Sequence, residues 1–546
     1  MDELIWKHVV LNAKKYGKPN AKAVMGKVIS ENPELKNQAK IVFRKVKEII
    51  EEFENLDDEK KRELFEKFEE ERKTEKLKGL PPLPNADRVV MRFAPNPNGP
   101  ATLGSARGIV INSEYAKMYK GKFILRFDDT DPRTKRPLPE AYDWYLEDCE
   151  WLDAKPDEVI YASKRIDVYY EYAKKLIEMG KAYVCKCGRD EFKKFKELGE
   201  DCPHRNREIE ENLEDWEKML NGEYNEGEAV LRIKTDMKHK DPAVRDWVAF
   251  RIIYADHPLV GDRYIVYPTL DFESAIEDHL QGVTHILRGK DLADSERRQR
   301  FIYEYFGWEY PLVRLWGRIR IQEFGKLSTS LIRKGIEEGR YSGWDDPRLP
   351  TLRSLRRRGF EPEAIRRFFI SLGVGENDVS VSMKNLHAEN RKIVDKKANR
   401  YFFVWDPVRL ELEGLEEPIT VEVPLHPEKG GVRKLTGEKS IYMTQDDYET
   451  FRGKIVRLKG FRSVRIEDGK AVVVEDTEFK KGKNIIHWLP ESQAVPCKVL
   501  GIERDYKGFV EANAKNDVGR VVQFERFAFC RIEKFEEEAL AIYTHE

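Results

Sequence analysis

A loop rich in proline and glycine, residues 92–105 (RFAPNPNGPATLGS), precedes a run with helical spacing. The first turn of a helix has free backbone N–H groups and the positive end of the helix dipole, and both favour phosphate. More than 200 residues downstream, KLSTS (326–330) places a lysine and hydroxyls in a segment that follows a glycine. Such a lysine can stabilise a polyphosphate as pyrophosphate leaves. Either segment alone is compatible with a structural turn, but together they predict a nucleotide site.

Three cysteines and a histidine form a second cluster with the spacing of metal ligands. Cys185 and Cys187 give C-x-C, and Cys202 and His204 give C-x-H after fourteen intervening residues. Sulfur and imidazole ligands suit tetrahedral Zn²⁺, and six cysteines spread over 546 residues do not suit a disulfide framework. With four protein ligands the zinc would be structural, because no position is left for water. The alternative is a set of buried thiols without metal.

The overall charge limits the class of protein. Lys and Arg number 98 and Asp and Glu 99, so the net charge of −1 argues against a protein that coats polyanions by bulk charge. The charge is segregated, however, because residues 331–410 carry a net +6 and include LRSLRRRGF. No apolar stretch approaches the ~18 residues of a membrane helix, and the first residues lack the layout of a targeting signal. We therefore expect a cytoplasmic protein.

The elements around the loop predict a parallel α/β sheet. Strands are expected at 88–94 and 122–127 on either side of a helix at 104–118. Two further short strands, 263–267 and 285–288, are expected to return to this sheet after a mixed insertion. Short alternating runs beyond residue 402, separated by Gly, Pro and Asp, are typical of small β barrels.

We predict a multidomain chain with an α/β Rossmann-type parallel-sheet domain, a zinc-containing insertion, a helical N-terminal module, a helical connector and a C-terminal all-β double barrel. The predicted boundaries are 1–85 for the helical module, 86–180 and 256–330 for the two halves of the sheet domain, 181–255 for the insertion, 331–400 for the connector and 401–546 for the two barrels.

Four ordered segments carry a resemblance to a known family. They are RFAPNPNGP (92–100), RFDDTDP (126–132), the run YPTLDFESAIEDHLQGVTHILRGKDLADSERRQ (267–299) and KLSTS (326–330). From about Arg88 onward the chain resembles class I glutamyl- and glutaminyl-tRNA synthetases, most closely the archaeal type of glutamyl-tRNA synthetase. The resemblance implies glutamate-tRNA ligase activity: ATP with Mg²⁺ converts L-glutamate to glutamyl-adenylate, and the glutamyl group passes to the 3'-terminal adenosine of tRNA(Glu). It also implies that 181–255 meets the acceptor end of the tRNA, that 331–400 contacts its stem, and that the barrels read the anticodon.

The resemblance also implies an ATP site. Its predicted members are Pro100, Thr102, Gly104, Ser105, Asp291, Lys326 and Ser328. Of these, Lys326, Thr102 and Ser105 are the predicted catalytic residues. The family's signature tetrapeptide commonly holds two histidines, but here it is Thr102 to Ser105, and the family's second signature lysine is Thr329. We therefore expect Lys326 to be the main cation at the phosphates.

The same resemblance implies an amino-acid site. Arg92 is expected to meet the carboxylate of the bound amino acid, Asp128 its ammonium, and Arg288 the extra negative charge that distinguishes glutamate from glutamine. The other predicted members line the pocket: Tyr267, Asp271 and Ser274. The alternative for Arg92 and Asp128 is a structural ion pair with each other or with their neighbours.

Five residues of the connector are expected to contact tRNA: Asp345, Arg348, Arg356, Arg357 and Arg358. Basic groups near phosphates increase affinity without reading sequence. The alternative is an ordinary solvated helix face.

Three functions stay open at this point. The first is a glutamate-tRNA ligase, expected to be a monomer, which would also charge tRNA(Gln) and pass it to a tRNA-dependent amidotransferase if no separate glutaminyl enzyme exists. The second is a glutaminyl-tRNA synthetase, against which Arg288, the zinc pattern and the helical start argue. The third is a non-catalytic protein that binds tRNA or amino acid, suggested by the missing histidines and the missing second lysine.

Overall fold

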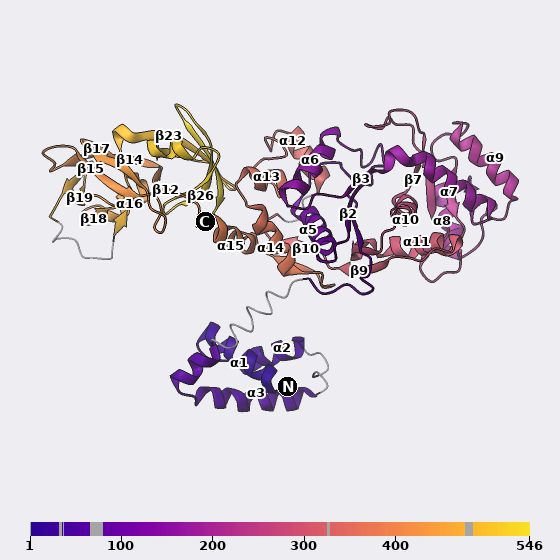
Figure 1. Cartoon of the computed structure of the whole chain (residues 1–546), viewed down its shortest axis with the longest axis horizontal. Helices are drawn as coiled ribbons and strands as arrows, with labels where there is room; N and C mark the ends of the chain where they lie inside the picture. Colours follow the sequence, from indigo (N-terminus) through magenta and orange to yellow (C-terminus); the bar gives the residue numbers. More distant parts are fainter. Residues whose placement is uncertain (1, 32–34, 36–37, 66–79, 325–327, 476–483) are drawn as a thin grey trace. The chain divides into compact units, whose positions relative to one another are not determined.

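The computed structural model describes residues 2–31, 35, 38–65, 80–324, 328–475 and 484–546. The chain divides into two compact units, Met1–Pro82 and Leu83–Glu546. Figure 1 labels many of the helices and strands of both units. None of the described helices is long and apolar enough to cross a membrane.

The first unit is helical in its described residues, as the sequence predicts. Its helices include α1 (Asp2–Tyr16), α2 (Ala21–Glu31) and α3 (Ala39–Glu54). In α3 the buried side chains recur three and four residues apart, which puts one apolar stripe against the other two helices. The buried side chains of this unit form a core of their own.

The second unit begins with a five-stranded parallel sheet in the order β3-β2-β1-β8-β9. Its strands are β1 (Val90–Phe93), β2 (Lys122–Phe127), β3 (Glu158–Tyr161), β8 (His285–Gly289) and β9 (Leu312–Trp316). The predicted parallel sheet is therefore confirmed, although β3 and β9 were not predicted. The strand order reverses between β1 and β8, and ligands of open α/β sheets collect beyond the carboxyl ends of the strands at such a point.

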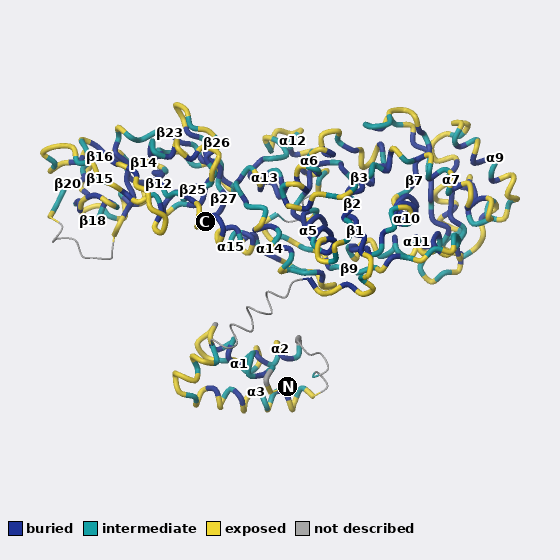
Figure 2. Tube along the Cα trace, in the orientation of Figure 1, coloured by how far each residue is buried: buried dark blue, intermediate teal, exposed yellow. Residues whose placement is uncertain are grey.

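The central strands are buried (Figure 2), as expected for a parallel sheet covered by helices. The helices nearest the site are α5 (Leu103–Met118), α6 (Pro139–Trp151), α10 (Leu270–Leu280) and α11 (Ala293–Phe306). The turn from α5 into β2 depends on Gly121, where a Cβ atom would lie 2.1 Å from the Val89 carbonyl oxygen. No side chain fits there, so glycine allows β2 to start directly beside β1.

The insertion is a mixed α/β segment with a four-stranded antiparallel sheet in the order β4-β5-β6-β7. Its elements are β4 (Ala182–Cys185), α8 (Arg189–Leu198), α9 (Ile209–Leu220), β5 (Val230–Ile233), β6 (Val248–Ile252) and β7 (Val266–Pro268). The strand predicted at 263–267 was therefore assigned to the wrong sheet. Tyr267 pairs with Arg251 of β6 and never reaches the parallel strands, because the chain passes through α10 before β8.

A helical connector follows the parallel sheet, as predicted. Its helices are α12 (Thr329–Glu337), α13 (Leu352–Arg357), α14 (Pro362–Leu372) and α15 (Met383–Val394), and a short parallel pair joins β10 (Ile319–Ile321) to β11 (Val379–Val381).

The C-terminal part is built mainly of β structure in two seven-stranded sheets and a hairpin, as the alternating runs predict. The first sheet contains β12 (Arg400–Tyr401), β25 (Val521–Phe524), β26 (Ala528–Phe535), β27 (Ala539–His545), β23 (Ala494–Leu500), β24 (Tyr506–Glu511) and β13 (Phe403–Trp405). The second contains β21 (Ile485–Ile486), β18 (Ile455–Leu458), β19 (Ser463–Glu467), β20 (Lys470–Val473), β14 (Pro407–Glu413), β17 (Ser440–Thr444) and β22 (Leu489–Pro490). The hairpin is β15 (Ile419–Pro424) with β16 (Val432–Gly437).

Candidate active site

The predicted phosphate loop leads from β1 into α5. Thr102 is the N-cap of this helix: its Oγ1 accepts a hydrogen bond from the Ser105 N–H at 3.4 Å and lies 3.5 Å from Ser105 Oγ. The connector holds the loop on its other side, because Leu103 N donates to Pro350 O and Leu352 N to Ala101 O. The first turn of α5 is therefore fixed in place, although the Thr102 hydroxyl already serves the helix itself.

The second predicted phosphate segment lies beside the first. Lys326 is outside the described residues, but Ser328 caps α12 by accepting from the Leu331 N–H at 3.3 Å. A Cβ on Gly99 would lie 2.3 Å from Thr329 Cγ2, and Arg333 Nη2 donates to Asn98 O at 2.6 Å. Two segments more than 200 residues apart in sequence therefore meet at the carboxyl end of β1.

The predicted amino-acid ligands Arg92 and Asp128 belong to one buried charge network but are not paired with each other. Arg92 Nε donates to Asp278 Oδ1 at 3.0 Å, and Arg126 donates both to Asp278 Oδ1 at 2.8 Å and to Asp128 Oδ1 at 2.7 Å. Burial alone would raise the pKa of Asp278, but the charges of Arg92 and Arg126 lower it to about 2. The two arginines are therefore held in place by the carboxylates of Asp128 and Asp278.

Glu273 adds a third carboxyl to this network. It is fully buried on α10, and its Oε2 accepts from Thr130 Oγ1 at 2.8 Å. Burial and the neighbouring Asp128 raise the pKa of Glu273 well above its usual range. The protonated form is therefore more favoured than in an ordinary glutamate, which opposes a third negative charge in the buried network.

A second buried cluster surrounds Arg288 at the end of β8. Arg288 Nη2 donates to Gln299 Oε1 at 2.9 Å, and Gln299 Nε2 donates to Ser274 Oγ at 2.9 Å. Arg288 Nη1 is buried without a hydrogen-bond partner among the described residues, and the same holds for the Tyr267 hydroxyl. Buried donors of this kind are expected to gain partners when a ligand binds.

The remaining predicted site residues differ in how far they are already engaged. Asp271 of α10 is buried, and its carboxylate accepts a hydrogen bond from Nη1 of Arg298 on α11 at 2.6 Å. Asp291 is half exposed just beyond β8, and its Oδ2 lies 3.8 Å from Arg318 Nη2. Asp291 therefore has a face open to a ligand, whereas Asp271 has little.

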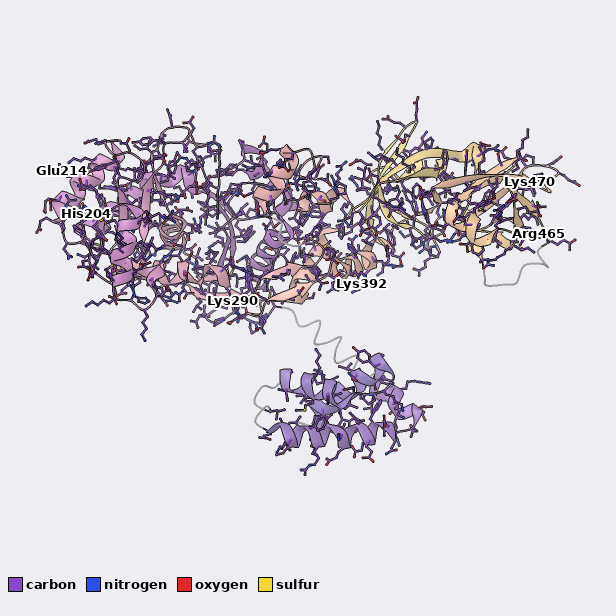
Figure 3. All side chains as sticks on the ribbon, turned by 180° about the vertical axis from the view of Figure 1, so that it is seen from behind. His204, Glu214, Lys290, Lys392, Arg465 and Lys470 are labelled. Carbon is purple, nitrogen blue, oxygen red and sulfur yellow. The ribbon has the colours of Figure 1, made fainter. Side chains whose placement is uncertain are left out.

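The cysteine and histidine cluster assembles as the spacing predicts. The ligand atoms of Cys185, Cys187, Cys202 and His204 all lie within 4.8 Å of one another. Cys185 Sγ is 3.9 Å from Cys202 Sγ, and Cys187 Sγ is 3.3 Å from His204 Nδ1. Sulfurs about 2.3 Å from a tetrahedral zinc would lie about 3.8 Å apart, so the donor set fits this ion. Figure 3 labels His204 in the insertion.

Comparison with known proteins decides the family. Residues 88–396 match the catalytic-domain model of tRNA synthetases class I (E and Q), and residues 398–480 and 485–533 match two anti-codon binding domain models of the same group. A glutamate-tRNA ligase of Archaeoglobus fulgidus is 66% identical over 551 residues, which cover 100% of both chains. Those of Methanosarcina mazei and Methanosarcina barkeri are 53% and 54% identical and cover 98% or more of each chain.

The chain belongs to the class I tRNA synthetases for glutamate and glutamine. It is therefore an aminoacyl-tRNA synthetase, an ATP-dependent ligase with a catalytic domain followed by two anticodon-binding domains.

The connector of this synthetase uses most of its arginines for internal contacts. Arg348 forms a two-point pair with Asp346 at 2.7 and 2.8 Å, and Arg357 forms one with Glu533 of β26 at 2.8 Å and also lies 3.6 Å from Asp345. Arg358 was predicted to contact tRNA, but it is fully buried and donates to the carbonyl oxygens of Tyr543 and Thr544, both in β27.

Arg358 therefore joins α13 to the first β sheet and leaves no surface for a phosphate. Arg357 also links α13 to this sheet, through its pair with Glu533. Arg356 is exposed, and it is the member of the predicted arginine trio with an open face.

A buried carboxyl of α6 lies close to this arginine helix. Asp148 is 1% exposed, and neither of its oxygens has a hydrogen-bond partner among the described residues. Burial raises the pKa of Asp148 to about 7, although the charges of Arg353 and Arg356 act in the opposite direction. Because the folded pKa lies above that of the unfolded chain, the carboxyl stabilises the fold fully below about pH 4, and this contribution is lost as the pH rises to about 7.

Asp148→Asn is therefore expected to increase the free energy of unfolding at pH 8 by about 2–4 kcal/mol, and by about half of that or less at pH 5. Urea denaturation at both pH values measures the change. Asp143→Asn, an exposed position on the same helix, serves as the control and should stay within about 0.5 kcal/mol. An equal gain for Asp148→Asn at both pH values would contradict the assignment.

Several site residues escaped the sequence prediction. Arg126, Glu273, Asp278 and Gln299 lie inside the segments that carry the resemblance, yet none was assigned a role. Their signal was weak because a buried polar residue in a helix or strand is recognised only through its partner. Asp278, for example, is 186 residues from Arg92.

Proposed function

We propose that the chain is a glutamate-tRNA ligase that activates L-glutamate with ATP and joins it to tRNA(Glu). The observation that carries the proposal is a second buried arginine at the site. Among the described residues Arg288 Nη1 has no hydrogen-bond partner, and Arg92 lies on the neighbouring strand. Two cationic groups suit an amino acid with two carboxylates. The relatives that match the whole chain carry the name glutamate-tRNA ligase.

Each predicted amino-acid ligand has a proposed role. Arg92, positioned by Asp278, binds the α-carboxylate, and Asp128 accepts from the ammonium. Arg288 binds the side-chain carboxylate. Ser274 belongs to the same subsite, because Gln299 forms hydrogen bonds to both Arg288 and Ser274. Tyr267 and Asp271 line the pocket. The site is built of charges and positioned donors, so catalysis rests on orientation and on stabilisation of developing charge, with no protein nucleophile.

ATP is proposed to lie at the first turn of α5, where Pro100, Thr102, Gly104 and Ser105 border the phosphates and Asp291 and Ser328 face them. Mg²⁺ accompanies the nucleotide and neutralises part of its charge. Lys326 supplies the protein's cation as pyrophosphate departs. A hydroxyl of the 3'-terminal ribose of the tRNA then attacks the carbonyl carbon of the adenylate, the bond from this carbon to the phosphate oxygen breaks, and AMP leaves.

Amino-acid-dependent exchange of pyrophosphate into ATP tests this proposal. The full chain is assayed with glutamate and with glutamine, each in the presence and absence of tRNA. Exchange that depends on glutamate supports it. Preference for glutamine would favour a glutaminyl-tRNA synthetase, and no exchange under any condition would favour a protein that only binds its ligands.

Zinc is proposed to bind Cys185, Cys187, Cys202 and His204 and to stabilise the insertion. Protein purified without chelator is expected to contain about one equivalent of zinc by metal analysis. Cys202→Ser should lower this below half an equivalent, whereas Cys149→Ser, at a buried thiol outside the cluster, should keep it. Wild-type protein with less than half an equivalent would refute the site.

The substrate range and the cellular setting are further proposals. A monomeric enzyme in the cytoplasm would charge tRNA(Gln) as well where a tRNA-dependent amidotransferase completes the product. Charging assays with the two purified tRNAs decide this, because a strict enzyme would aminoacylate tRNA(Glu) alone. Asp345, Arg348 and Arg356 are the connector residues we propose at the tRNA surface.

A further inference from the structure

Gln299 lies at the centre of the cluster around Arg288. It is 1% exposed, on α11, and its Oε1 accepts from Arg288 Nη2 at 2.9 Å and from the Tyr310 hydroxyl at 2.6 Å. Its Nε2 donates to Ser274 Oγ at 2.9 Å. One amide therefore joins β8, α10 and Tyr310, two residues before β9.

The chemistry of the partners determines which way the amide points. A guanidinium can only donate, so the oxygen of Gln299 must face Arg288. The nitrogen must then face Ser274, whose Oγ accepts. Tyr310 strengthens this orientation because its hydroxyl donates to the same oxygen. A flipped amide would set two donors against each other at Arg288.

This orientation determines what the two partners can offer to a ligand. With Nη2 engaged, Arg288 keeps Nη1, which is buried and has no partner in the described part of the chain. Ser274 uses a lone pair to accept from Gln299, and no acceptor for its own hydroxyl hydrogen lies among the described residues. Arg288 Nη1 can therefore only donate, and Ser274 has its hydroxyl hydrogen to donate as well as a second lone pair.

We propose that Gln299 is a positioning residue that makes the side-chain subsite a pair of donors and thereby selects glutamate over glutamine. This inference rests on the proposed function. A carboxylate has two acceptor oxygens and a negative charge, so it can accept from both Arg288 and Ser274, whereas a glutamine side chain has one acceptor oxygen and no charge, so one of the two donors is left without an acceptor. A buried donor without an acceptor carries the full desolvation cost, so the amide substrate is rejected.

Gln299→Glu tests the inference directly. A carboxylate at this position cancels the charge of Arg288 and accepts the Ser274 hydrogen, so the subsite loses its donors. The KM for glutamate is expected to rise about 10- to 100-fold while kcat changes less than about threefold. The ratio of kcat/KM for glutamate to that for glutamine should fall by a similar factor, measured by pyrophosphate exchange with the full chain and tRNA.

Two further variants separate orientation from packing. Gln299→Met keeps the volume but removes the hydrogen bonds, and it should lower selectivity in the same direction. Tyr310→Phe removes one donor to the same oxygen but leaves the link from Arg288 to Ser274, so selectivity should change less than about threefold. Melting curves identify any variant that fails to fold, and Gln299→Met then takes the place of Gln299→Glu.

Unchanged KM and selectivity in folded Gln299→Glu and Gln299→Met, beside a wild type that activates glutamate, would overturn the role of Gln299 alone. An equal loss of selectivity in Tyr310→Phe would also overturn it, because packing would then explain the effect. A wild-type chain that does not activate glutamate would overturn the proposed function and this inference with it.

Discussion

Replacing Asp278 by alanine is expected to cost about 3–5 kcal/mol of the free energy of unfolding of the catalytic domain and to abolish glutamate activation. Asp278 is 1% exposed and accepts from both Arg92 and Arg126. Without it two guanidinium groups stay buried with only Asp128 to balance them. Arg92 also loses the partner that fixes its direction, so the proposed α-carboxylate subsite is displaced.

Chemical denaturation and pyrophosphate exchange measure the two effects. Glu158→Gln is the control, because Glu158 pairs with Lys122 on neighbouring strands but both side chains are about 40% exposed, and it should cost about 1 kcal/mol or less. If the alanine variant does not fold, Asp278→Asn keeps the volume and removes only the charge. Wild-type stability in both variants would contradict a structural role for the network.

The carboxylate of Asp278 also makes the stability of the protein depend on pH in the acid range. The folded pKa of Asp278 is about 2, below the usual value for aspartate, so its contribution to stability is present above about pH 4 and is lost as the pH falls toward 2. Asp278→Asn should therefore lose less stability than wild type over this interval.

Replacing Lys326 by alanine is expected to lower kcat by about 10²–10³-fold, with a smaller change in the KM for ATP. Two features make Lys326 the main side chain that can stabilise the departing pyrophosphate. The family's signature histidines are absent, and Thr102, which stands in the signature, already caps α5. No imidazolium is then available, so the charge that develops as pyrophosphate leaves falls to the helix N-terminus and Lys326.

Steady-state exchange and single-turnover kinetics measure this loss. Lys334→Ala is the matched control, because Lys334 lies on α12 four residues after the signature segment, is 67% exposed, and pairs only with Glu338 among the described residues. It should keep wild-type kcat. Equal activity of Lys326→Ala and wild type would remove Lys326 from the mechanism.

Local patterns in the sequence predict much of this fold. The strand, loop, helix and strand between Arg88 and Phe127 occur as predicted because their apolar runs and the turn residues between them are local signals. The cluster of three cysteines and a histidine is equally local, since the two pairs flank one short helix, α8. Alternating runs such as 419–423 and 454–458 also form strands, which need only a period of two.

Partners far apart in sequence decide the rest. The run at 266–268 is too short to indicate its own sheet, and pairing with β6 places it in the insertion. The three consecutive arginines 356–358 cannot be told apart from the sequence. In the structure Arg356 is exposed, Arg357 pairs with Glu533 and Arg358 is fully buried, because β26 and β27 cover one side of α13.

The sequence by itself therefore determined many of the elements, the order of the motifs and the chemical types at the site. Only the tertiary structure decided which charges are free to meet a ligand and which are paired inside the protein. The physical reason is that burying a charge or an amide is costly unless a partner is present, and the partners of Arg92, Arg288 and Arg358 lie on other strands and helices. The orientation of Gln299, which no local pattern indicates, follows from those same partners.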